Sequence, residues 1–272
     1  MRLIRRKAAS PLDEFVDVFW LFGNAAQAAT KERALPDGCV QFIVNLREDR
    51  TSIYDRHDFR VRETFNGCAL VGPQSEFAVI DGGGPIELAG IHFKPGGAFP
   101  FLSPPAGELH GLQLPLDVLW GGMAAAMRER LLEARTPHEQ FNVMEQVLLA
   151  RMTRPLSRHP AVDFALRQFA GGRSQAIADV TARTGLSSRR FIELFRGEVG
   201  LTPKLFCRVR RFQRVLRCIA SGKPVVWADV ALDAGYFDQA HFIHDFRAFS
   251  GINPSAYMET RPWHMNHVPL PR

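Results

Sequence analysis

Cysteines and histidines are the residues of this chain that could act as nucleophiles or metal ligands. The 272-residue sequence contains four cysteines, Cys39, Cys68, Cys207 and Cys218, which lie far apart and form no C-x-x-C pair. Zinc sites and disulfide scaffolds usually show cysteines at short, regular spacings. The pattern therefore predicts neither, and it is typical of a protein from a reducing cytoplasm, the localisation that we expect.

The histidines of the first half also lack the spacing of a metal or catalytic site. His57, His92 and His110 are isolated from one another, and no His-x-His pair precedes a carboxylate. No G-x-S-x-G or G-x-x-x-x-G-K-[ST] motif occurs. His92 lies in an apolar Ile-His-Phe sequence, which favours a packed histidine, and Asp37 in Pro-Asp-Gly favours turn chemistry. We therefore expect no enzyme activity, no metal and no cofactor.

The basic residues are concentrated in one part of the chain. Residues 1–155 carry 17 Lys+Arg and 19 Asp+Glu (net −2), whereas residues 156–272 carry 17 and 9 (net +8). A local excess of positive charge favours a polyanionic partner such as nucleic acid, but a merely basic domain shows the same charge. A motif is needed to decide between the two.

A repeat within the basic part supplies such a motif. Its copies run from Ile177 to Phe206 and from Trp227 to Tyr257. They align at an offset of 50 residues at Gly185/Gly235 and of 51 after the turn, at Phe195/Phe246, Arg196/Arg247, Gly200/Gly251, Pro203/Pro254 and Phe206/Tyr257. One inserted residue between parallel copies indicates duplication of a supersecondary unit, and two copies are too few for a solenoid.

Each copy has the local sequence of a helix-turn-helix. Its first glycine supplies the positive φ that a tight turn between two helices requires. Ser187 and Asp238 fit as N-caps of the following helix, and Gly200 and Gly251 as residues that end it. The inward face of that helix consists of apolar residues at helical spacing: Phe191, Leu194 and Phe195, then Phe242 and Phe246. An ordinary helical hairpin packed in a core is the alternative.

A helix predicted over Lys204–Ala220 joins the two copies. Its apolar stripe consists of Leu205, Val209, Phe212, Leu216 and Ile219, and its arginines, Arg208, Arg210, Arg211, Arg214 and Arg217, lie outside the stripe. A helix of this size is a rod of about 25 Å. Such a rod could hold two reading helices about 34 Å apart, so that one chain reads two successive major grooves without dimerising. The arginines fit either phosphate contact or a solvated helix face.

The two copies and the helix between them resemble the DNA-binding domain of the AraC/XylS family of bacterial transcription regulators. The resemblance covers about residues 160–260 and rests on TGLSSRRFIELFRGEVGLTPKLF and DVALDAGYFDQAHFIHDFRAFSGINPSAY. It implies that the second helix of each unit enters the major groove of double-stranded DNA. By position, the residues facing the bases are Arg189, Arg190, Ile192 and Glu193 in the first unit and Gln239, Ala240 and His244 in the second.

The side chains at these positions suit different contacts. Arg189 can pair with guanine and Gln239 with adenine, each discriminating by about 1–3 kcal/mol. Ile192 and Ala240 suit thymine methyl groups, whereas Arg196 and Arg247 suit phosphates. The second unit departs from the family pattern at two positions, where Phe237 replaces a small polar residue and His244 a longer basic one.

Residues 1–155 predict a smaller β-structure followed by helices. Extended runs at Val40–Leu46, Ala69–Gly72 and Ile86–Phe93 indicate a barrel or sandwich up to about residue 114, and Leu116–Ala134 and Pro137–Thr153 predict a helical hairpin. The stretches LPDGCVQFIVNL, LVGPQSEF and GIHFKPGGAFPFL resemble a cupin-like domain that precedes the same DNA-binding module in some AraC-type regulators. We thus expect an α+β fold: a β-barrel-like domain with a helical hairpin (1–155), an all-α domain of two helix-turn-helix units (156–260) and a tail (261–272).

These features favour a sequence-specific transcription regulator that responds to a small molecule of unknown identity. The hairpin at 116–153 is the expected dimer or relay element, and a homodimer and RNA polymerase are candidate partners. No run of about 18 apolar residues occurs, so no membrane partner is expected. Two alternatives remain: a DNA-repair-like enzyme using Cys39 and Cys68, fused to a DNA-binding module, and a non-specific nucleic-acid binder.

Overall fold

The computed structural model describes residues 1–25, 31–82, 85–171, 176–222, 225–260 and 264–270. Its strands are β1 (Arg2–Arg6), β2 (Val16–Asn24), β3 (Lys31–Ala34), β4 (Gln41–Asn45), β5 (Thr51–Tyr54), β6 (Arg62–Phe65), β7 (Cys68–Val71), β8 (Ala78–Asp81), β9 (Ile86–Phe93), β10 (Gln113–Pro115) and β11 (His267–Pro269). Its α-helices are α1 (Asp117–Trp120), α2 (Gly122–Glu133), α3 (Pro137–Arg151), α4 (Pro160–Ala170), α5 (Ile177–Arg183), α6 (Ser188–Val199), α7 (Pro203–Ala220), α8 (Trp227–Ala234), α9 (Gln239–Ser250) and α10 (Pro254–Thr260). Two short 3₁₀ helices, η1 (Phe99–Phe101) and η2 (Ala106–Glu108), follow β9.

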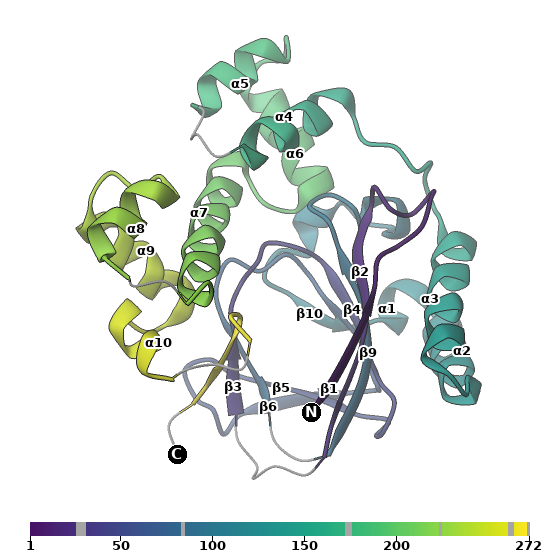
Figure 1. Ribbon diagram of the computed structural model, residues 1–272. Helices are drawn as coiled ribbons and strands as arrows, with labels where there is room; N and C mark the ends of the chain where they lie inside the picture. The colour runs from purple at the N-terminus through teal and green to yellow at the C-terminus, as the bar shows by residue number, and fades with distance from the viewer. Residues whose placement is uncertain (26–30, 83–84, 172–175, 223–224, 261–263, 271–272) are drawn as a thin grey trace.

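The strands form two antiparallel sheets (Figure 1). The first sheet has the order β1-β2-β9-β4-β7-β10, and the second has the order β11-β3-β8-β5-β6. The three strands that the sequence predicts correspond to β4, β7 and β9, all in the first sheet. The expected α+β class, with a sheet-rich N-terminal part and a helical C-terminal part, is confirmed.

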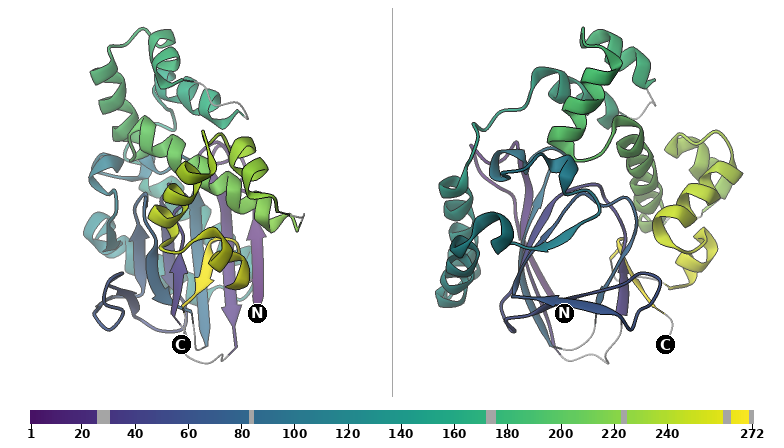
Figure 2. Two further views of the ribbon diagram at one scale, coloured as in Figure 1. Left: turned by 90° about the vertical axis from the view of Figure 1, so that its left-hand side faces the viewer. Right: turned by 180° about the vertical axis from the view of Figure 1, so that it is seen from behind.

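The helical hairpin covers the first sheet (Figures 1 and 2). Trp120 packs edge-on against Phe42, which also packs edge-on against Phe93, with ring centroids 4.9 Å apart in both pairs. These rings join α1 to β4 and β9 in one buried core. The helix predicted over Leu116–Ala134 is interrupted at Gly121, whose φ of 56° breaks it into α1 and α2.

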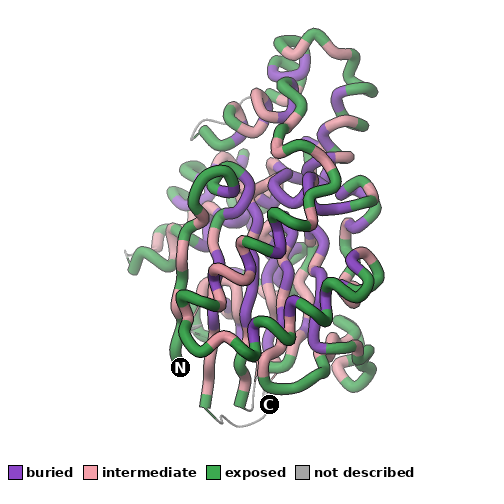
Figure 3. The backbone as a smooth tube through the Cα atoms, turned by 90° about the vertical axis from the view of Figure 1, so that its right-hand side faces the viewer, coloured by how far each residue is buried: buried purple, intermediate pink, exposed green. Residues whose placement is uncertain are grey.

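The helices after residue 160 enclose a second core that is rich in phenylalanine. Phenylalanine rings from α4, α6, α7 and α9 fill this core. Figure 3 shows how buried and exposed residues alternate along the backbone. Leu35 of the N-terminal part and Val268 of β11 belong to the same cluster. Strand β11, which lies in the predicted tail, pairs with β3 and so attaches the C-terminus to the second sheet.

Within the described residues, no helix combines the length and apolar character that crossing a bilayer requires.

Candidate nucleic-acid interface

The first helix-turn-helix unit consists of α5 and α6. Between them, Gly185 has a φ of 72°, and the Ser187 hydroxyl accepts a hydrogen bond from the backbone N–H of Arg190. The N-cap therefore fixes where α6 begins. Phe191 and Phe195 are fully buried, so the opposite face of the helix is directed outward.

The second unit consists of α8 and α9 and repeats this geometry. Gly235 has a φ of 89°, and the Asp238 carboxylate accepts a hydrogen bond of 2.7 Å from the backbone N–H of His241. Phe242 and Phe246 are buried, and Gly251 ends the helix in the left-handed conformation, as Gly200 does for α6. The turn, the N-cap, the buried face and the terminal glycine all agree with the sequence expectations.

The residues predicted to contact DNA are all exposed. They are Arg189, Arg190, Ile192, Glu193 and Arg196 on α6, and Gln239, Ala240, His244 and Arg247 on α9. Their exposure leaves the first turns of both helices accessible. The Arg189 side chain is 90% exposed and forms an ion pair of 3.0 Å with Glu193, one helical turn away.

Arg196 differs from the other predicted contacts because it lies against the N-terminal part. Its Nη2 donates to the Gly107 carbonyl oxygen of η2 at 3.4 Å. Next to it, Gly200 is close to Pro73 and to the Ala106 carbonyl. The C-terminal half of α6 is thus packed on the N-terminal part of the molecule, while Arg189 and Arg190 near its start are exposed.

Three of the arginines on α7 act within the domain, a role that the sequence did not indicate. Arg208 donates to both carboxylate oxygens of Asp245 on α9. Arg211 lies over the Tyr236 ring, 5.2 Å from its centroid. Arg214 donates to the carbonyl oxygens of Gly171 and Ala234, at the C-terminal ends of α4 and α8. These contacts fasten the linker helix α7 to the second unit and to α4. The Arg214 contacts follow the preference of cations for helix C-termini.

Asp245 is the central charge of this arrangement. Its side chain is only 2% exposed, and Arg208 lies 2.6 Å from it. Arg211, His241 and His244 each place a nitrogen 3.9 Å from its carboxylate. This buried carboxylate therefore sets the position of α9 relative to α7.

The linker helix also contacts the N-terminal part. Gln213 is buried and donates to the Pro36 carbonyl oxygen at 2.8 Å and to the Asn266 side-chain oxygen at 3.0 Å. A Cβ on Gly38 would lie 3.1 Å from Leu201 and 3.4 Å from Val209. The turn before β4 therefore touches the helix that holds the two reading helices.

Residues 180–260 match a family described as a helix-turn-helix domain. The C-terminal domain is an AraC-type helix-turn-helix domain. Domains of this type bind DNA in transcription regulators, so the chain is a DNA-binding transcription regulator. Residues 5–115 match a domain of unknown function, DUF6597. No curated protein matches the chain.

Several solved structures resemble this regulator. A structure of ToxT from Vibrio cholerae is 12% identical, covers 89% of this chain and 97% of its own, and has a TM-score of 0.48. Another ToxT structure from the same organism, bound to an unsaturated fatty acid, is 11% identical, with coverages of 88% and 94% and a TM-score of 0.46. A probable AraC family transcriptional regulator from Rhodopseudomonas palustris is 29% identical over 37% of this chain and 96% of its own, with a TM-score of 0.34.

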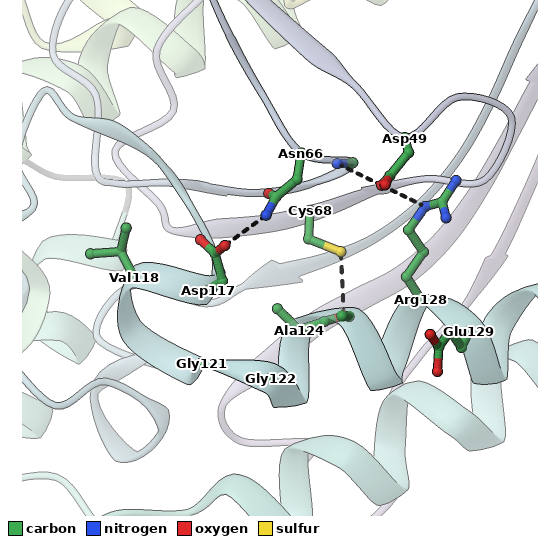
Figure 4. Close-up of a pocket in the computed structure, with 12 residues that line it drawn as sticks. Asp49, Asn66, Cys68, Asp117, Val118, Gly121, Gly122, Ala124, Arg128 and Glu129 are labelled. Carbon is green, nitrogen blue, oxygen red and sulfur yellow. Dashed lines mark hydrogen bonds and ion pairs between the residues drawn. The ribbon is translucent and has the colours of Figure 1, made fainter.

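Ahead of the AraC-type domain, a pocket of about 580 Å³ lies between the sheet and the helical hairpin (Figure 4). Its lining includes the carboxylates of Asp49, Asp117 and Glu129 and the Arg128 guanidinium. Asn66 donates to Asp117 at 2.7 Å, and Arg128 lies 3.6 Å from Asp49. The volume is in the range of small-molecule sites.

The two cysteines of the N-terminal part are not placed for nucleophilic chemistry. Both Cys39 and Cys68 are buried. Burial raises the pKa of the Cys68 thiol to about 11 and, together with the negative charge of Asp37, raises the pKa of the Cys39 thiol well above its ordinary value. Because the thiolate is the nucleophile, burial disfavours nucleophilic attack by these thiols.

Proposed function

We propose that the chain regulates transcription by binding a DNA site of two half-sites, one read by α6 and the other by α9. The observation that carries this proposal is the duplicated unit: two capped helices expose their first turns and are fastened to one linker helix. Arg189, Arg190, Ile192 and Glu193 would face one major groove, and Gln239, Ala240 and His244 the next. Arg196 and Arg247 would contact phosphates. To do so, Arg196 would give up its hydrogen bond to the Gly107 carbonyl oxygen.

Selection of bound fragments from sheared genomic DNA tests this proposal. The intact chain is the right reagent, because Leu35 and β11 join the C-terminal core to the N-terminal sheets. We expect one enriched motif with two half-sites about 10 bp apart. A steep dependence on salt with no enriched sequence would instead support the non-specific nucleic-acid binder.

The domain division 1–155, 156–260 and 261–272 also belongs to the proposal. In support of it, the helices of the hairpin end at Arg151 and α4 begins at Pro160. The tail would then connect the DNA-binding domain back to the N-terminal part, since β11 pairs with β3 and extends the second sheet.

A small polar molecule is the proposed signal, and the pocket at the hairpin is its proposed site. Three carboxylates and one arginine favour a ligand that carries hydroxyl or cationic groups over an anion. A ligand there would touch α2, whose partner α3 leads directly to α4 and the DNA-binding domain. It would act by stabilising one arrangement of the domains.

Filling this pocket should uncouple the signal from DNA binding. Gly122 lines the pocket, and a Cβ added to it meets nothing within 4 Å, so Gly122→Leu is expected to fold normally. The variant should bind its DNA motif with unchanged affinity but lose the response to the metabolite that shifts wild-type binding. Fluorescence anisotropy with labelled motif DNA measures both. Gly23→Leu is the control, because Gly23 lies outside the pocket and a Cβ added to it likewise meets nothing within 4 Å. An unchanged metabolite response in Gly122→Leu would place the effector elsewhere.

The chain is proposed to have no enzymatic activity; in support, its N-terminal cysteines are buried and burial raises the pKa of both thiols. Methyl transfer from alkylated DNA to either cysteine would contradict this and revive the repair-enzyme alternative. The outer face of the α2–α3 hairpin is the proposed surface for a homodimer, and RNA polymerase remains a proposed partner of the DNA-bound regulator.

A further inference from the structure

A cluster of metal-ligating side chains lies outside both the DNA-binding surface and the pocket. Asp37 and Cys39 come from the turn before β4, and His92 comes from the neighbouring strand β9. One ligand atom from each of the three lies within 4.8 Å of the other two. The group combines a carboxylate oxygen, a thiol sulfur and an imidazole nitrogen.

We propose that Asp37, Cys39 and His92 bind a divalent metal ion with the ligand preferences of Zn²⁺. Bonds of about 2.0–2.3 Å in a tetrahedral site place ligand atoms roughly 3.3–3.7 Å apart. His92 Nε2 and Asp37 Oδ2 are now 2.7 Å apart, so the two groups need to separate only slightly around an ion. Water takes the fourth position.

The turn that carries two of the ligands is already ordered for this role. The Asp37 Oδ1 atom accepts a hydrogen bond of 2.9 Å from the backbone N–H of Cys39, which leaves Oδ2 directed at His92. Cys39 is 7% exposed. The ligands are therefore positioned before binding.

A second carboxylate, that of Asp17, faces the other ring nitrogen of His92. Asp17 Oδ2 lies 3.5 Å from Nδ1, the ring nitrogen that the metal would not use. Asp17 is the extra residue of a β-bulge in β2, because Val16 pairs with Phe93 and Val18 with His92. Bulges re-aim side chains, and histidines that bind metals usually donate their other N–H to a carboxylate.

The bound metal would replace two protons. Burial lowers the pKa of His92, but the charge of Asp37 and hydrogen bonding of the imidazole to the carboxylates of Asp17 and Asp37 outweigh it and raise that pKa to about 10. Ligation by His92 requires the neutral imidazole, and ligation by Cys39 requires the thiolate. On binding, His92 and Cys39 each release a proton to water while the ion adds two charges, so the formal charge of the cluster does not change.

The turn that carries Asp37 and Cys39 also contacts the DNA-binding domain. Gly38, between two of the ligands, packs on Leu201 and Val209, and the Pro36 carbonyl accepts from Gln213 of α7. Metal binding at this turn is therefore expected to stabilise the position of the linker helix α7. This consequence alone rests on the proposed DNA-binding function, since metal binding itself can be measured without DNA.

Titration of the reduced full-length chain with Co²⁺, a spectroscopic substitute for Zn²⁺, tests the proposal. We expect a thiolate-to-cobalt charge-transfer band that saturates at one equivalent and disappears when Zn²⁺ is added. Cys39→Ser should remove the band, whereas Cys68→Ser, at another buried thiol of the same domain, should keep it. Circular dichroism checks that both variants are folded.

Asp17→Asn provides a variant at a more exposed position. The Asp17 side chain is 56% exposed, so its replacement should leave the fold intact. It should keep the charge-transfer band but weaken metal affinity by about 10–100-fold, as loss of a carboxylate behind a ligating histidine does. Absence of the band in the wild type, or its persistence in Cys39→Ser, would overturn the proposal and leave a purely structural Asp17–His92–Asp37 ion-pair cluster.

Discussion

Replacing Asp245 with alanine should destabilise the C-terminal domain by about 3 kcal/mol and abolish recognition of one half-site. Removing one partner of a buried ion pair costs about 3–5 kcal/mol, and the lower end applies here because Arg208 is 31% exposed. Without the carboxylate, the positive charges of Arg208 and Arg211 would lie close together with no buried counter-charge. Chemical denaturation measures the loss of stability, and footprinting on a two-half-site DNA measures the loss of contact by α9.

Asp233→Ala is the matched control for this prediction. Asp233 lies on α8 of the same unit, but its side chain is exposed, so the substitution should change the free energy of unfolding by less than about 0.5 kcal/mol. Equal stability of the two variants would show that the cluster around Asp245 does not hold α9. Loss of stability in Asp245→Ala with both half-sites still protected would show that Asp245 stabilises the domain but is not needed to position α9 on DNA.

The local features of the DNA-binding domain were predictable because short-range chemistry determines them. Gly185 and Gly235 are needed for a positive φ, and Ser187 and Asp238 cap the helix that begins right after them. The buried phenylalanines follow from helical periodicity. The repeat raised each of these signals above chance, since both copies carry the same residues at the same places.

Contacts between distant segments were not predictable from the sequence. The arginines of α7 fitted phosphate contact or solvent, yet Arg208 and Arg214 bind groups on other helices. Strand β11 has only three residues and pairs with β3, more than 200 residues earlier in the chain. His92 was interpreted as a packed histidine because it lies in an apolar Ile-His-Phe sequence. Asp37 and Cys39 are far from it in the sequence, and only the pairing of β4 with β9 brings the three together.

Changing Arg189 to alanine should relax base preference at one position of the DNA motif while leaving the protein as stable as the wild type. A bidentate arginine–guanine pair discriminates by about 1–3 kcal/mol, so preference at that position should fall by roughly 5- to 150-fold. Stability should not change because the side chain is 90% exposed and its ion pair with Glu193 lies on the surface. Binding to a library randomised at each motif position measures the effect.

Arg247→Ala is the comparison that gives this result its meaning. Arg247 is exposed near the end of α9, where a phosphate contact is expected, so its loss should weaken all sequences alike and lower the salt dependence of binding by about one counterion. Position-specific loss in one variant and uniform loss in the other would together orient the helices on DNA, with their first turns toward the bases. If both variants lose affinity uniformly, α6 does not enter the groove by its first turn. The exposed residues of that turn would then serve attraction to the phosphate backbone and not sequence readout.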